Sequence, residues 1–185
     1  MVLLIAAAGI AYLAVRGGRS LLEPAAPHSA QLPVQAGDLT LQLPDQWRGR
    51  QMKGVAGASQ RWAFGSKGAR NNALFLTRYP LKRTPKDDQQ TKQLKSEVQA
   101  GLARTGGPKR PRMVDEEKIG GQNAWRYSFR TKKIWIDIWL VIHTLKDKSA
   151  AYQFSCQSPP GQSGQEMRKL CAQTLDSVKF SEKHP

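Results

Sequence analysis

The stretch that most constrains this chain is the run of residues 132–145, Lys-Lys-Ile-Trp-Ile-Asp-Ile-Trp-Leu-Val-Ile-His-Thr-Leu. It contains no Gly or Pro and is mostly Ile, Val, Leu and Trp, so it predicts one long strand. Side chains alternate faces along a strand. One face is therefore wholly apolar and the other mostly so, carrying respectively Ile134, Ile136, Ile138, Leu140 and Ile142, and Trp135, Asp137, Trp139, Val141 and His143. Two apolar faces are typical of a strand that is covered on both sides.

Shorter segments predict the rest of the fold. Alternating or apolar stretches predict strands at residues 38–44, 60–67, 73–79, 113–119, 123–131 and 150–156, with a Gly-rich basic loop at residues 48–59. Thr84, Pro85 and Asp87 indicate the start of a helix over residues 84–105, and Ser163 with Glu166 indicates a capping box at the start of a second helix. Strands, helix, strands, helix is the order of an α+β domain with a mainly antiparallel sheet.

The beginning of the chain differs from this domain. Residues 2–15 are almost entirely apolar and are followed by Arg16 and Arg19. As a helix they would span about 21 Å, less than the roughly 30 Å hydrocarbon core, which favours a signal segment or a short signal anchor. We expect an uncleaved anchor with the rest exported; a buried apolar helix is the alternative. Arg16 and Arg19 oppose that orientation, because basic residues favour the cytoplasmic side.

The expected organisation has four parts. Residues 1–16 form the signal or anchor segment, residues 17–36 an Ala- and Pro-rich linker, residues 37–182 the α+β domain, and residues 183–185 a tail. The linker would carry the domain away from the membrane.

Three segments resemble the PsbP-like superfamily, which includes DcrB-type envelope lipoproteins and the extrinsic photosystem II subunit. They are Leu-Gln-Leu-Pro-Asp-Gln-Trp at residues 41–47, Gly-Gly-Gln-Asn-Ala-Trp-Arg at residues 120–126, and Asp-Ser-Val-Lys-Phe at residues 176–180. The resemblance covers residues 32–183. It implies an α/β/α sandwich, with helices on both faces of an antiparallel sheet, and a non-enzymatic accessory or binding role, usually outside the cytoplasm. It carries over no catalytic residue.

Cys156 and Cys171 are the two cysteines of the chain. One ends a predicted strand and the other lies on the inner side of the following helix. In an exported domain this placement predicts a disulfide, which would restrain the loop by about 3 kcal/mol in the chain-entropy model. Two buried thiols are the alternative. No metal site is predicted, because neither cysteine has neighbouring His or paired carboxylates.

The excess of basic residues is the strongest functional indication in the sequence. Lys and Arg number 29 against 14 Asp and Glu, a formal net charge of +15, and such a field favours anionic partners. The residues predicted to face an anionic surface lie mostly in turns and at element ends: Arg48, Arg50, Lys53, Lys82, Arg83, Lys109, Arg110, Arg112, Arg130, Lys132 and Lys133. A solvated basic surface that only maintains solubility is the alternative.

Enzymatic chemistry finds little support in the sequence. His28 and His184 lie in predicted tails, and His143 is separated from Asp137 by about 20 Å of strand, so these two cannot form a dyad. Ser163 is explained by helix capping, and no Gly-rich phosphate loop is present.

We therefore expect a non-enzymatic, membrane-anchored extracytoplasmic module without a cofactor. Its partner would be an envelope protein or an anionic lipid surface. A polyanion or nucleic-acid binder is the first alternative, although the alternating Trp125, Tyr127 and Phe129 predict core side chains rather than a stacking platform. An enzyme with groups assembled from distant positions is the second.

Overall fold

The computed structural model describes residues 33–53, 57–66, 73–81, 85, 89–94, 96, 113–131, 133–145 and 148–181. The predicted anchor at residues 1–16, the linker up to residue 32 and the tail at residues 183–185 lie outside the described residues. So does most of the predicted helix at residues 84–105. Of its described residues, 89–94 and 96 are helical, whereas Pro85, predicted at the first helical position, is not. No helix among the described residues is both long enough and apolar enough to cross a bilayer.

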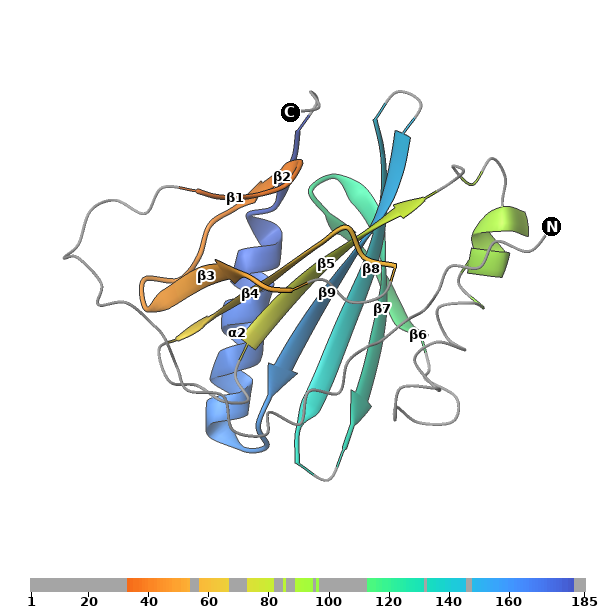
Figure 1. The fold of residues 1–185 in the computed structure, drawn as a ribbon. Coiled ribbons are helices and arrows are strands. Elements are labelled where there is room, and N and C mark those ends of the chain that lie inside the picture. Colours follow the sequence, from red (N-terminus) through yellow and green to blue (C-terminus); the bar gives the residue numbers. More distant parts are fainter. Residues whose placement is uncertain are drawn as a thin grey trace.

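Seven strands form the main sheet, in the order β3-β4-β5-β9-β8-β7-β6, and every neighbouring pair is antiparallel (Figure 1). Their bounds are β3 (Trp47–Gln51), β4 (Gln60–Ser66), β5 (Ala73–Leu81), β6 (Met113–Ile119), β7 (Gln122–Arg130), β8 (Trp135–Leu145) and β9 (Lys148–Ser158). The predicted long strand is β8, which lies inside the sheet between β9 and β7. It pairs with β9 along its whole length, from Trp135 opposite Ser158 to Leu145 opposite Lys148.

A second, three-stranded sheet joins the two ends of the described chain. It consists of β1 (Val34–Ala36), β2 (Leu39–Leu41) and β10 (Lys179–Phe180), with β2 in the middle. Residues 34–36, which we expected in the linker, therefore form a strand. In Figure 1 this small sheet lies near one end of helix α2 (Gln162–Asp176). Gly120, in the turn after β6, lies against it: at a φ of 56°, a Cβ there would come 2.8 Å from the Phe180 ring.

The main sheet has a buried cluster on each side. We call the side that carries α2 and the small sheet the α2 face; its core includes Leu39, Leu41, Phe64, Leu74, Trp139, Val141, Tyr152, Phe154 and Met167. We call the other side the distal face; its core includes Leu94, Trp125, Tyr127, Phe129, Ile136, Ile138 and Leu140. The two rows of β8 thus point to opposite sides, as the alternation predicts, and the predicted core role of Trp125, Tyr127 and Phe129 is confirmed.

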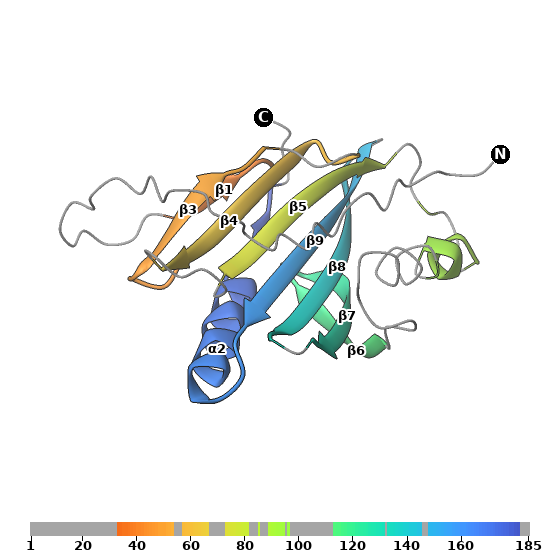
Figure 2. The same cartoon turned by 60° about the horizontal axis from the view of Figure 1, so that its bottom comes forward.

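The expected α/β/α sandwich is wrong. The described chain is mostly antiparallel sheet, and helices do not cover its two faces. Helix α2 lies along one side (Figure 2) and shares the α2 face with the small sheet. The two apolar rows on β8 indicate that both faces of the sheet are covered. They do not indicate whether helices or strands form the cover, so the sequence pattern could not distinguish the two.

Strand β3 corrects the predicted loop at residues 48–59. It is an edge strand with only Trp47 buried, so it lacks the two-residue apolar period that marks a strand. Packing explains the glycine at position 49, because a Cβ there would come 2.9 Å from Phe64 Cδ1.

Helix α2 follows β9 and buries Met167, Cys171 and Leu175 against the sheet. It begins after Gly161, and no side chain caps it, so the predicted capping box at Ser163 is wrong. The close passage of Pro159 explains the glycine in its first turn: a Cβ on Gly164 would lie 1.7 Å from the Pro159 carbonyl oxygen. The predicted disulfide is present between Cys156 of β9 and Cys171 of α2, with Cα atoms 6.2 Å apart.

Candidate functional site

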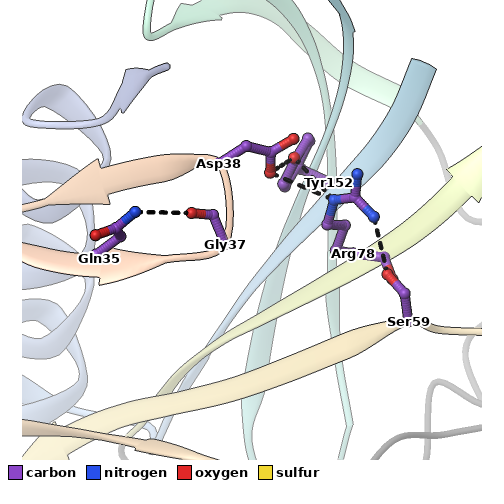
Figure 3. A network of polar contacts seen from close by, with 6 residues as sticks. All are labelled: Gln35, Gly37, Asp38, Ser59, Arg78 and Tyr152. Atoms are coloured by element: carbon purple, nitrogen blue, oxygen red, sulfur yellow. Dashed lines mark hydrogen bonds and ion pairs between the residues drawn. The ribbon is translucent and has the colours of Figure 1, made fainter. Parts of the chain in front are cut away.

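At one end of the molecule, three polar side chains tie the small sheet to the main sheet (Figure 3). Asp38 comes from the turn between β1 and β2, Arg78 from β5 and Tyr152 from β9. The Tyr152 hydroxyl donates a hydrogen bond to Asp38 Oδ1. Arg78 Nε lies 3.3 Å from the same carboxylate oxygen and 3.1 Å from the Tyr152 hydroxyl oxygen. Arg78 Nη1 also donates to Ser59 Oγ over 3.0 Å.

The charges in this network follow from its surroundings. Burial raises the pKa of Asp38, but the hydrogen bond from Tyr152 and the charge of Arg78 outweigh burial, so this pKa lies below its usual value. The pKa of Tyr152 is raised, first by burial and then by its hydrogen bond to Asp38. At neutral pH the network therefore holds a carboxylate, a guanidinium and a neutral phenol. Asp38 and Tyr152 are buried, so the network joins the two sheets inside the molecule.

Phe180 of β10 completes this junction. Its ring stacks on His143, with centroids 4.6 Å apart, and meets the Tyr152 ring edge-on at 5.2 Å. The Ser181 backbone N–H donates to the Asp38 carbonyl oxygen over 2.7 Å. His143 is 8% exposed and lies in the core, and its two ring nitrogens have no hydrogen-bond partner among the described residues.

A second polar cluster lies on the α2 face, towards the β6 edge. Arg126 of β7 binds Glu117 of β6 over 3.0 Å and Asp137 of β8 over 3.2 Å. Trp139 Nε1 donates to Glu117 Oε2 over 2.9 Å, and the Arg126 guanidinium carbon lies 5.3 Å from the Trp139 ring centroid. Asp137 thus contacts Arg126 rather than His143. One guanidinium is shared between two carboxylates, so the cluster ties β6, β7 and β8 together and has a formal charge of −1.

A different arrangement lies where β7 ends and β8 begins. The guanidinium carbons of Arg130 and Arg168 lie 5.6 Å and 5.7 Å from the ring of Trp135. Arg130 and Lys133 are exposed, whereas Trp135 and Arg168 are partly buried. We call these four residues, Arg130, Lys133, Trp135 and Arg168, the basic end. Within the described part of the chain, none of its three cations forms an ion pair with a carboxylate.

The long-range neighbours in the basic end follow from the sheet register. Arg130 pairs directly with Trp135 across the β7–β8 hairpin. Trp135 also pairs with Ser158 at the end of β9, and Ser158 Oγ accepts a hydrogen bond from Arg168 Nη1 over 3.3 Å. The pairing of Trp135 with Ser158, and the hydrogen bond from Arg168 to Ser158, therefore bring Arg168 of α2 beside Trp135 of β8.

The structure separates the predicted basic residues. Arg130 and Lys133 lie in the basic end, whereas Arg48, Arg50 and Lys53 lie on or just after β3, at the far edge of the sheet. Five strand spacings separate β3 from β7, or about 24 Å at the usual inter-strand distance. The remaining predicted residues lie outside the described part of the chain: Lys82, Arg83, Lys109, Arg110, Arg112 and Lys132.

Sequence reasoning missed two members of the basic end, Trp135 and Arg168. The alternation placed Trp135 on the less apolar face, and a correct register for the hairpin would have put Arg130 beside it. No local signal marks Arg168, because its contact with Trp135 depends on how α2 packs. Among the described residues, no three His, Cys, Asp or Glu side chains gather as metal ligands.

Comparison with known proteins found limited similarity. The crystal structure of LpqN, described as involved in cell envelope biogenesis of Mycobacterium tuberculosis, is 15% identical, with a TM-score of 0.47, and the match covers 82% of this chain and 91% of LpqN. A protein of Bacteroides thetaiotaomicron is 12% identical, with a TM-score of 0.45 and coverage of 79% of this chain. The match spans only 46% of the Bacteroides protein.

Neither likeness supports a family or a function, because both TM-scores are below 0.5. No family model and no curated protein matches the chain. The resemblance to the PsbP-like superfamily therefore has no support from these comparisons, and the sandwich that it implied is not the observed architecture.

Proposed function

We propose that this chain is a non-enzymatic accessory module that works on the extracytoplasmic side of a membrane. We further propose that it contacts the anionic lipid surface through the basic end. The observation that carries this proposal is the placement of the partly buried Trp135 beside the guanidinium groups of Arg130 and Arg168. Tryptophan favours the level of the lipid headgroups, and each Lys or Arg near an anionic surface contributes about 1 kcal/mol.

The disulfide supports the extracytoplasmic assignment. Bonds between cysteines persist in oxidising compartments and are rare in the cytosol, and Cys156 is joined to Cys171. The anchor at residues 1–16 stays a prediction. If it is present, it would hold the domain close to the bilayer, where weak contacts of the basic end gain from a high effective concentration.

The lipid contact can be measured by fluorescence quenching. The full chain would be reconstituted into vesicles whose anionic lipids carry bromine near the headgroup. We expect these lipids to quench part of the tryptophan fluorescence, and the Trp135→Phe variant to lose most of that quenching. An Arg130→Gln, Arg168→Gln double variant should lose it as well, because the cations hold the ring at the surface.

The matched control is Trp125→Phe, since Trp125 is buried on the distal face and its removal should leave headgroup quenching unchanged. Vesicles of zwitterionic lipid should quench weakly. If Trp135→Phe is quenched as strongly as the parent chain, the basic end is not the contact. Tight DNA binding that falls steeply with salt, without lipid contact, would instead favour the polyanion alternative.

A further inference from the structure

The distal face contains a buried arginine without a counter-charge. Arg61 of β4 is 7% exposed, and its Nε is buried without a hydrogen-bond partner. Within the described part of the chain, no carboxylate lies within ion-pair distance of its guanidinium. The guanidinium carbon lies 5.4 Å from the centroid of the Phe75 ring.

This situation differs from that of the other inward-facing arginines. Arg78 is held by Asp38, and Arg126 is held by Glu117 and Asp137. An arginine side chain keeps its proton at any physiological pH, so burial cannot neutralise it. Removing such a charge from water without a partner is strongly unfavourable, and native proteins satisfy buried cations with an anion. Burial accordingly lowers the pKa of Arg61.

Two further buried polar atoms on the same face lack partners. Ser155 Oγ on β9 and the Tyr127 hydroxyl on β7 make no hydrogen bond to the residues that the structure describes. The register places Phe75 opposite Ser155, Ser155 opposite Ile138, and Ile138 opposite Tyr127, in one row across the sheet. Arg61 lies opposite Thr77, two residues along β5 from Phe75 and therefore on the same face.

The side chains around Arg61 are apolar or neutral. Phe75 and Tyr79 are both partly buried and flank Thr77 on the strand next to Arg61. Burial raises the pKa of Tyr79, so its phenol is neutral at pH 7. One fixed positive charge is thus set among aromatic surfaces, with a free hydroxyl at Ser155 in the neighbouring row. A single charge is balanced by a single negative charge; a phosphate monoester would bring nearly two.

We propose that the distal face binds an amphiphile with a monoanionic oxyanion head group. The head group pairs with Arg61, and the apolar body of the ligand lies against Phe75 and Tyr79. A fatty-acid carboxylate and a phosphodiester of a phospholipid share this chemistry. The site is separate from the basic end, which lies on the α2 face, so either can exist without the other.

The test is calorimetric titration of the full chain in nonionic detergent with three water-soluble probes. Decanoate supplies the carboxylate, dihexanoyl phosphatidylglycerol supplies the phosphodiester, and decanamide is the uncharged control. We expect one of the two anions to bind and decanamide to bind at least about tenfold more weakly, as expected for loss of a charged hydrogen bond. The anion that binds identifies the source of the head group.

Arg61→Gln should weaken binding of that anion by about tenfold or more. Ser155→Ala, a small change that leaves the sheet intact, should weaken it by about threefold. Lys179→Gln removes one positive charge at an exposed position of β10, outside both proposed sites, and should leave the affinity unchanged. The quenching by brominated vesicles should be unaffected by Arg61→Gln, so failure of this site and failure of the lipid-surface contact can be told apart.

Unfolding without a ligand provides a second readout. If Arg61 has a structural role, Arg61→Gln should unfold at a lower midpoint than the parent chain. If Arg61 belongs to an unoccupied anion site, the unfolding midpoint of Arg61→Gln should equal or exceed that of the parent, because the variant removes a buried unpaired charge. The proposal is overturned if neither anion binds the parent chain. It is also overturned if either Arg61→Gln or Ser155→Ala binds the anion as tightly as the parent does, or if Arg61→Gln has a lower unfolding midpoint.

Discussion

Tyr127 and Tyr152 are two fully buried tyrosines of one sheet whose hydroxyls have opposite surroundings. The Tyr152 hydroxyl donates to Asp38 and accepts from Arg78. The Tyr127 hydroxyl has no partner among the described residues. The same substitution to phenylalanine therefore removes a used group in one case and an unused group in the other.

We expect Tyr152→Phe to lower the free energy of unfolding by about 1–3 kcal/mol, because Asp38 and Arg78 lose a partner in a buried site. Tyr127→Phe should change it by less than about 0.5 kcal/mol or raise it, since no hydrogen bond is lost. Urea unfolding of the two variants beside the parent chain measures both values. Equal losses would show that the Tyr127 hydroxyl has a partner after all.

At this scale the sequence predicted side-chain direction well and polar contacts poorly. Alternation placed Ile136, Ile138 and Trp139 on their observed faces, because the two-residue period of a strand is local. The contact between Asp38 and Tyr152 joins residues 114 positions apart. Only the packing of the small sheet on the main sheet brings them together, and no local pattern encodes that packing.

The disulfide fastens one element to the next, because it joins the inner side of α2 to β9. We expect both cysteines to resist alkylation in cells and to become reactive after reduction and unfolding. Reduction should lower the free energy of unfolding by about 3 kcal/mol, the chain-entropy value for a loop of this size. A Cys156→Ala, Cys171→Ala double variant serves as the control, since reductant should not change its stability. Thiols that react without reductant would contradict the extracytoplasmic assignment.

Elements were predictable where one face is apolar over several residues, as in β4, β5, β7 and β8. Strand β3 escaped prediction because four of its five residues are exposed. The start of α2 was misread for a related reason. Serine is a common N-cap residue, so Ser163 was predicted to cap the helix. The chain instead turns at Gly161, where φ is 85°, and the helix begins at Gln162, so Ser163 already lies inside it.

The stability of the whole domain should depend on pH at both extremes. The folded pKa of Asp38 lies below its ordinary value of 3.8, so its contribution is present above that pH and is lost as the pH falls through the folded value. Burial, and then the charge of Glu116, raise the pKa of Tyr127 from 10.0 to about 12. The pKa of Tyr152 is raised as well. Above pH 10 the unfolded chain therefore loses protons that the folded chain keeps, and stability falls as the pH rises.

Urea unfolding at a series of pH values from about 3 to 11 checks this profile. Asp38→Asn should remove part of the loss at the acid end and lower the stability at neutral pH. It should also reduce the loss at the alkaline end, because the hydrogen bond to Asp38 helps to raise the pKa of Tyr152. If the free energy of unfolding of Asp38→Asn falls as steeply at low pH as that of the parent chain, other carboxylates cause the acid loss.

Architecture was the level at which sequence reasoning failed. The rows of β8 indicated a buried inner strand, which is correct, but the covering layers were assigned to helices. On the α2 face, part of that cover is a sheet built from β1, β2 and β10. Strands of two or three residues carry almost no pattern, so their joint contribution to the core becomes visible only in three dimensions.

The small sheet has a consequence for how this protein is made. Leu39 of β2 pairs with Phe180 of β10, so the partner of an early strand is synthesised roughly 140 residues later, a delay of about 10 s at typical elongation rates. Until then Leu39 and Leu41 have no completed core to enter. A nascent chain of this kind emerges from the ribosome, or crosses a membrane, in an unfinished form that holding chaperones and proteases can recognise. The small sheet can be completed only after β10 has been synthesised.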